Sequence, residues 1–194
     1  AEDAQTLYYR TDHHWTTEGA YRAYRLLMRE KRESSVMRDA FSVERVPDFY
    51  GTSYSKSGLW LTPPDEIELW TNPDLRAITR VYDGNSQEPV VQEGMLFREY
   101  LSEADKYPVF LSGNHARIHI ETNADTDKRL LVVKDSYAHA LAPFLAEEYR
   151  TIDLIDLRYF KRQTISDWLK EHPADEILFV YGLSSLAGDK NLQW

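Results

Sequence analysis

The chain has 194 residues, of which 42% are hydrophobic and 13% aromatic, so its composition is that of a globular protein and not of a disordered one. A net charge of -9 argues against nucleic acid or an anionic membrane surface as a partner. The absence of cysteine excludes disulfides, thiolate metal sites and cysteine nucleophiles. No apolar run approaches the roughly 20 residues that a membrane-spanning helix needs.

The first part of the chain combines one helix with short strands. Thr16 or Thr17 can cap a helix that runs to about Lys31, because apolar residues then recur at helical spacing. Residues 48–58 are rich in small and hydroxyl side chains and are predicted to form a loop, whereas residues 92–105 are predicted to be helical. Alternation of apolar and polar residues predicts three strands, the last of them edge-like or half exposed: 66–70, 77–83 and 116–123.

From Arg129 onward, unbroken apolar runs alternate with helical patterns. The runs "RLLVVKDS", "TIDLIDLR" and "EILFVYG" are predicted to be strands, the first of them buried. Helical patterns lie between them at 137–149 and 164–172, and Pro143 should kink or break the first of these helices. This β-α-β-α-β order predicts a parallel sheet with helices on its faces.

The carboxyl ends of the three predicted strands carry polar residues, and open parallel sheets place their chemistry at such ends. Ser136 falls where the first strand passes into a helix N-terminus, whose N–H groups and dipole favour negative charge. A serine at this corner can attack a carbonyl group while neighbouring N–H groups hold the oxyanion. Taken alone, Ser136 is better explained as the N-cap of the helix than as a nucleophile.

The stretch "YYRTDHHWTTEGAY" places Asp12, His13 and His14 directly before the first helix. A serine nucleophile needs a base, and the base needs an orienting carboxylate; such triads occur in several chain orders. Asp12 and His14 therefore favour a catalytic role for Ser136 over a simple cap. A metal site is the main alternative, but adjacent residues seldom supply two ligands to one ion, and the spacing His-x-x-x-His is absent.

Three further residues have a structural interpretation. If His14 points into a cleft, its neighbour His13 should point elsewhere. Trp15 is expected to pack over the start of the helix. His139 follows Ser136 by three residues and is either an alternative base or, as the better prediction, a partly exposed helix residue.

Four segments together resemble the DHHW protein family, a bacterial branch of the SGNH hydrolase-like superfamily: "TDHHWTTEGAY", "FYGTSYSKSG", "LLVVKDSYAHALAPFL" and "IDLIDLRYF". The resemblance runs from about Tyr8 to Tyr181 and extends to the alginate O-acetylation proteins. It implies an α/β fold of SGNH hydrolase-like (flavodoxin-like) type, with a parallel sheet flanked by helices and a circularly permuted motif order. We expect one such domain, or its C-terminal part, over 1–194, with a β-rich insertion at 41–125 and a parallel core at 129–182.

Carried over residue by residue, the resemblance makes Ser136 the nucleophile, His14 the base and Asp12 the residue that orients the base. Lys134 stands where the superfamily pattern has a glycine, and the glycine and asparagine of its oxyanion hole are also replaced. The residues expected to contact the oxyanion or the substrate are Tyr137, Arg158, Tyr181, Gly182, Tyr50 and Thr52. No metal and no cofactor are expected.

The function implied by the resemblance is acyl transfer on carbohydrate O-acyl groups through an acyl-serine. The enzyme would be an esterase if water is the acceptor and an O-acetyltransferase if a sugar hydroxyl is. The alternative is a non-catalytic carbohydrate-binding or scaffold component of a cell-surface polysaccharide modification system. Expected partners are a polysaccharide or a small acyl ester and, from the resemblance, a membrane acyltransferase, at a location outside the cytoplasm.

The predicted parallel core of three strands is small, and the resemblance implies more of the core ahead of the DHHW block in longer relatives. Exposed sheet edges invite pairing. We therefore expect either a missing N-terminal portion or a homodimer to cover an exposed apolar edge or face.

Overall fold

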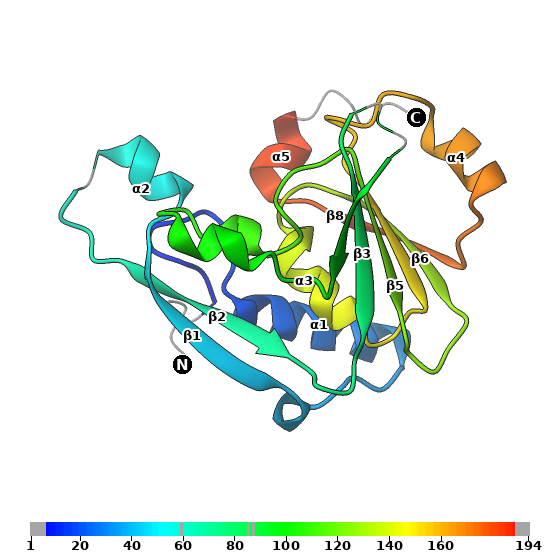
Figure 1. The fold of residues 1–194 in the computed structure, drawn as a ribbon, viewed down its shortest axis with the longest axis horizontal. Coiled ribbons are helices and arrows are strands. Elements are labelled where there is room, and N and C mark those ends of the chain that lie inside the picture. Colours follow the sequence, from blue (N-terminus) through cyan, green and yellow to red (C-terminus); the bar gives the residue numbers. More distant parts are fainter. Residues whose placement is uncertain (1–6, 59, 85, 87, 189–194) are drawn as a thin grey trace.

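The computed structural model describes residues 7–58, 60–84, 86 and 88–188 (Figure 1). Its strands are β1 (Ser42–Phe49), β2 (Asp65–Thr71), β3 (Ala77–Tyr82), β4 (Val90–Glu93), β5 (Arg117–Thr122), β6 (Arg129–Lys134), β7 (Thr151–Ile155) and β8 (Glu176–Val180). Its α-helices are α1 (Thr17–Lys31), α2 (Thr52–Ser57), α3 (Ala138–Leu145), α4 (Ile165–Glu171) and α5 (Leu183–Gly188). Short 3-10 helices are η2 (Arg38–Ala40), η3 (Arg98–Ser102) and η4 (Tyr107–Val109). Within the described residues, no helix is long and apolar enough to cross a membrane.

A mixed sheet of six strands forms the centre of the molecule, in the order β4-β3-β5-β7-β6-β8. β6 pairs in parallel with β7 and β8, while β5 pairs antiparallel with β7 and β3. The parallel prediction therefore holds for the three C-terminal strands, and antiparallel strands from the earlier part of the chain extend the same sheet. The structure is a mixed α/β fold with helices on both faces of this sheet.

The two faces of β6 are buried against different helices, as Figure 1 shows. Leu130 and Val132 belong to the larger core, which α1 and α3 cover. Leu131 and Val133 belong to a smaller core under α4. Because successive side chains of a strand point to opposite faces, the unbroken apolar run of β6 follows directly from its burial on both sides.

Helix α1 follows the sequence expectation closely. Its N-cap is Thr16, whose Oγ1 accepts a hydrogen bond from the Gly19 N–H at 3.1 Å, and it ends at Lys31. Ala20, Tyr24 and Met28 are fully buried at helical spacing and pack toward α3. The helix therefore fixes the segment that precedes it, which carries Asp12 and His14.

Several predictions about the middle of the chain need correction. Residues 92–105 do not form an α-helix, since they hold the end of β4 and the 3-10 helix η3. The predicted loop at 48–58 contains α2, and β1 was not predicted because nearly all of its residues are exposed and do not alternate. β5 is half exposed as predicted, with Ile118 and Ile120 buried, but it is not an edge strand because it lies between β3 and β7.

Candidate active site

Asp12, His14 and Ser136 form one chain of hydrogen bonds. Nε2 of His14 lies 2.7 Å from Oγ of Ser136, and Nδ1 of His14 is hydrogen-bonded to Oδ1 of Asp12. Asp12 and His14 are each 4% exposed, whereas Ser136 keeps partial contact with solvent. This is the order of nucleophile, base and orienting acid that acyl transfer through serine needs.

The segment before α1 is a closed loop that sets the position of the acid and the base. The Tyr9 N–H donates to the His14 carbonyl at 3.2 Å, and the Thr16 N–H donates to the Leu7 carbonyl at 2.9 Å. Inside this loop Oδ1 of Asp12 also accepts the His14 N–H at 2.9 Å. The two catalytic candidates are therefore held by local backbone contacts as well as by each other.

The second oxygen of Asp12 is held by the start of α2. Oδ2 accepts the Thr52 N–H at 2.8 Å and the Thr52 hydroxyl at 3.0 Å. Gly51 allows this approach, since a Cβ at that position would lie 2.3 Å from the Asp12 Cβ. Burial alone would raise the pKa of Asp12, but the neighbouring His13 ring, the hydrogen bonds from His14 and the charge of His14 lower the pKa below its ordinary value. Thr52, predicted to contact substrate, is placed here to hold the acid.

Burial lowers the pKa of His14, and the bond to Asp12 opposes that shift only in part. The imidazole is thus neutral at neutral pH, with its Nδ1 proton directed at Asp12 and its Nε2 free to accept the Ser136 proton. His13 points away from Ser136: its Nδ1 lies 2.7 Å from Oγ1 of Thr52, and the ring is about half exposed.

Tyr107 belongs to the site but was not predicted from the sequence. Its ring lies parallel to the His14 ring, with centroids 3.7 Å apart and planes 4° apart. Its hydroxyl donates to the Ser136 carbonyl at 3.1 Å. No local pattern marks this tyrosine, because both contacts are made by residues far away in the sequence.

The N–H groups expected near an oxyanion meet a carboxylate in this structure. Oδ1 of Asp135 accepts the Tyr137 N–H and Oδ2 accepts the Gly182 N–H, both at 2.9 Å. The Tyr137 ring packs edge-on against Trp15, whose Nε1 donates to the Tyr137 carbonyl at 3.1 Å. Asp135 therefore ties the ends of β6 and β8 together behind Ser136.

The other predicted contact residues are dispersed. Arg158 donates from Nε and Nη2 to Asp156 at 2.9 and 2.6 Å, and its Nη2 also reaches Oδ1 of Asn114 at 3.2 Å. Tyr181 packs against the core under α4. Tyr50 is half buried and its ring lies 4.5 Å from the ring of Tyr54.

A buried charged layer lies beside the triad. Nζ of Lys134 lies 2.6 Å from Nε2 of His139 and 3.7 Å from Oδ2 of Asp156, and burial lowers the pKa of Lys134 to about 8. The prediction that His139 is partly exposed is wrong, since it is 1% exposed. Because Lys134 occupies its Nε2, His139 is not arranged as an alternative base.

The DHHW segment also brings together three side chains that can ligate a metal ion. Asp12, His13 and His14 offer one ligand atom each, and these atoms lie within 4.8 Å of one another. In the structure, however, His14 Nδ1 is bonded to Asp12 and His13 Nδ1 to Thr52. The hydrogen bonds of the triad and of Thr52 account for the arrangement of these groups.

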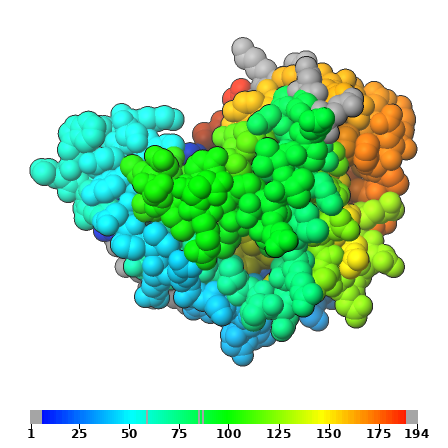
Figure 2. Space-filling view, in the orientation of Figure 1, coloured from blue at the N-terminus to red at the C-terminus, as the bar shows by residue number. Residues whose placement is uncertain are grey.

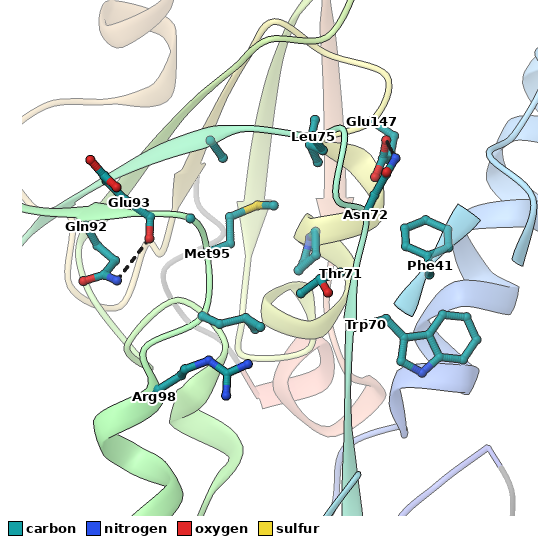
Figure 3. Close-up of a pocket in the computed structure, with 14 residues that line it drawn as sticks. Phe41, Trp70, Thr71, Asn72, Leu75, Gln92, Glu93, Met95, Arg98 and Glu147 are labelled. Atoms are coloured by element: carbon teal, nitrogen blue, oxygen red, sulfur yellow. Dashed lines mark hydrogen bonds between the residues drawn. The ribbon is translucent and has the colours of Figure 1, made fainter. Parts of the chain in front are cut away.

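A separate cavity of about 280 Å³ lies near the C-terminal end of α3 (Figure 3). Phe41, Leu75 and Met95 contribute apolar walls, and Glu147 lies beside Asn72 at one end. No triad residue lines this cavity. Ser136 instead follows the carboxyl end of β6, and Thr52 at the start of α2 contacts Asp12. Figure 2 shows a notch between α2 (cyan) and α5 (red).

Residues 1–155 match the protein family described as DHHW protein. The chain belongs to the DHHW protein family. Its fold is similar to a crystal structure of a DHHW family protein from Eubacterium siraeum DSM 15702, with a TM-score of 0.81 and 25% identity over 97% of this chain and 63% of that one. Among curated proteins, none matches this chain.

Bacillus cereus PatB1 has a similar fold in two structures, one of them with a sulfonyl adduct. Both have a TM-score of 0.76, at 23% identity with the adduct and 21% without it. Each covers 96% of this chain, and this chain spans 64% and 66% of those PatB1 chains. The present chain therefore spans less than two thirds of the length of these solved relatives.

Proposed function

We propose that this DHHW protein is an acyl-serine enzyme of the SGNH hydrolase-like superfamily, with its histidine block placed before its serine block. The observation that carries the proposal is the 2.7 Å contact between His14 Nε2 and Ser136 Oγ, backed by the buried, ionised Asp12. A helix N-cap role for Ser136 explains neither the buried histidine nor its carboxylate. Acyl transfer explains both.

In the proposed reaction Oγ of Ser136 forms a bond to the acyl carbon while its proton passes to Nε2 of His14. The leaving oxygen takes that proton as its bond to the acyl carbon breaks. An acceptor hydroxyl then gives its proton to Nε2 and attacks the acyl-serine, and the proton returns to Oγ as the serine leaves. Asp12 stays ionised throughout, because its hydrogen bonds hold its pKa below the ordinary value.

The oxyanion that forms on the acyl group needs donors. The backbone N–H groups of Tyr137 and Gly182 both donate to Asp135 and are therefore engaged. We therefore assign the Ser136 N–H, directly before α3, as the first donor. Arg158 would be a second donor only if its guanidinium left Asn114. In this structure Arg158 is therefore not part of a formed oxyanion hole.

The proposed substrate class is a carbohydrate O-acyl group, transferred to water or to a sugar hydroxyl. The α2 segment beside Asp12 supports it. Tyr54 packs between Tyr50 and Trp60, with ring centroids 4.5 and 5.5 Å away, and Trp60 is 70% exposed. Exposed aromatic rings next to hydroxyl side chains suit the apolar faces and polar edges of sugars.

The rival function is a non-catalytic carbohydrate-binding or scaffold component. The engagement of the Tyr137 and Gly182 N–H groups by Asp135 favours it, because it leaves the oxyanion hole incomplete. A polysaccharide partner, a membrane acyltransferase and an extracytoplasmic location belong to either proposal.

The edge strand β8 leaves Ile177 and Phe179 about half exposed, which supports coverage of this edge by a second copy or by another part of a longer protein.

Hydrolysis of a small chromogenic acetyl ester tests the enzyme proposal. Wild type should show turnover that Ser136→Ala abolishes, and an added oligosaccharide acceptor should divert acetyl groups from water if the protein is a transferase. Equal rates for wild type and Ser136→Ala would reject the acyl-serine and favour the binding role. The PatB1 adduct adds a second probe, since sulfonyl fluorides react with activated serines.

A further inference from the structure

Tyr107 is placed between the base and the core of the protein. It is 4% exposed, and the face of its ring covers one face of the His14 imidazole at 3.7 Å. Its other neighbours include Phe110, which contacts it edge-on, and His139, whose ring centroid lies 6.3 Å away. The tyrosine ring thus stacks on the base and also lies close to the buried Lys134–His139 pair.

The stacked geometry matters most when His14 carries the proton. A cation over an aromatic face is attracted by the ring quadrupole, and the attraction grows where water is excluded. His14 becomes an imidazolium as it takes the Ser136 proton, and burial makes that cation unfavourable. The Tyr107 face therefore lowers the free energy of the charged intermediate on the side of the ring that Asp12 does not reach.

The hydroxyl of Tyr107 acts on the nucleophile. It donates to the Ser136 carbonyl at 3.1 Å, and that carbonyl also accepts the His139 N–H at 3.2 Å in the first turn leading into α3. One side chain thus contacts the base through its ring and the nucleophile's backbone through its oxygen. A displacement of about 1 Å between such groups is enough to slow catalysis strongly.

We propose that Tyr107 is a positioning residue for this site, holding the plane of the His14 ring and stabilising its protonated form while anchoring the backbone of Ser136. This inference rests on the proposed function for its effect on rate, but the contact with His14 can be tested without turnover. Other titratable groups also act on His14: Asp12, His13, Asp135 and Asp105. The test therefore has to change the Tyr107 ring while leaving those groups in place.

The decisive experiment keeps the shape of the ring and changes its electrostatics. Tyr107→Phe should leave the His14 titration midpoint, followed by NMR of the imidazole, close to that of wild type. Replacing the same side chain with pentafluorophenylalanine reverses the ring quadrupole at nearly constant shape. The midpoint should then fall by roughly one pKa unit relative to Tyr107→Phe, with about a tenfold lower kcat on the small acetyl ester.

Tyr24→Leu is the matched control for loss of core packing. Tyr24 is also fully buried, but its hydroxyl donates to Glu148 and its ring packs against Tyr21 and Phe144. This variant should lose stability without a change in the His14 midpoint, whereas Tyr107→Leu should shift the midpoint as well. An equal midpoint for the phenylalanine and pentafluorophenylalanine variants would overturn the inference. Absence of turnover in wild type would reject the proposed function alone, since the midpoints could still be compared.

Discussion

Two carboxyl groups of this protein, the buried Asp12 and the partly buried Glu147, have pKa values shifted in opposite directions. Asp12 accepts two hydrogen bonds from His14 and two from Thr52, and its pKa lies below the ordinary value. Glu147 accepts one from Nδ2 of Asn72 at 2.9 Å, and its Oε1 has no partner among the described residues. Burial, with the nearby charges of Glu148 and Asp74, raises the pKa of Glu147 to about 7.

The difference shows that hydrogen-bond donors, and not depth of burial, decide the charge of these groups. Asp12 sits where a loop turn and the start of α2 both direct N–H groups at it, so it is ready to balance an imidazolium. Glu147 lines the cavity of Figure 3 with too few donors and is protonated over part of the neutral range. The first carboxyl serves the proposed chemistry, whereas the second reduces stability.

Replacing the acid should have the largest effect. Asp12→Asn keeps the size of the side chain but removes the charge and presents an amide where Nδ1 of His14 needs an acceptor. We expect kcat on the acetyl ester to fall roughly a thousandfold to ten-thousandfold, because the imidazole loses its orientation and its counter-charge. Circular dichroism should show an intact fold. A loss below tenfold would mean that Asp12 is not the orienting acid.

Adding a methyl group next to Asp12 should lower kcat less than replacing Asp12 itself. In Gly51→Ala the new Cβ would meet the Asp12 side chain at 2.3–2.6 Å, so Asp12 or α2 must move. A shift of this size should lower kcat about a hundredfold with little change in KM for a small ester. Gly188→Ala is the control, since nothing lies within 4 Å of its added Cβ. If both variants keep full activity, the contact between α2 and Asp12 does not matter for the reaction.

Removing the charge of Glu147 should change the stability of the protein and not its activity. The pKa of Glu147 is about 7 in the folded protein against 4.5 ordinarily, so the folded chain binds more protons between these values and loses stability as the pH rises through them. Glu147→Gln keeps an oxygen for Asn72 and removes the charge. Allowing for partial exposure, it should raise the free energy of unfolding by about 1–2 kcal/mol at pH 8. Denaturation at pH 4 should show little gain, and a gain equal at both values would contradict the account.

The residues of the candidate triad could be predicted from the sequence because each belongs to a local pattern. Asp12 and His14 stand before a well-capped helix, and Ser136 stands where an apolar strand passes into a helix. The partners of these residues could not be predicted in the same way. Tyr107 reaches His14 and Ser136 through tertiary contacts, and the role of Thr52 depends on where α2 docks on Asp12.

The helices and strands could be predicted where burial of one face spaces the apolar residues at a regular interval. α1 and the strands β2, β3, β5 and β6 show helical or alternating patterns, or an apolar run, that match their environments. β1 pairs with β2 but exposes nearly all its side chains, so no period marks it. The segment 92–105 has apolar residues at helical spacing but forms no α-helix. The Phe97 N–H donates to the Val109 carbonyl, and the Phe97 side chain is buried by tertiary packing.

The central claim is that Ser136 carries the acyl group, and intact-protein mass spectrometry after brief exposure to the acetyl ester tests it most directly. Wild type should gain one acetyl group at early times, located on Ser136 by peptide mapping and absent from Ser136→Ala. Asp12→Asn and Gly51→Ala should form this acetylated species more slowly. Acetylation found only at other residues, or formed equally in Ser136→Ala, would contradict the account and leave the DHHW segment as a structural or binding element.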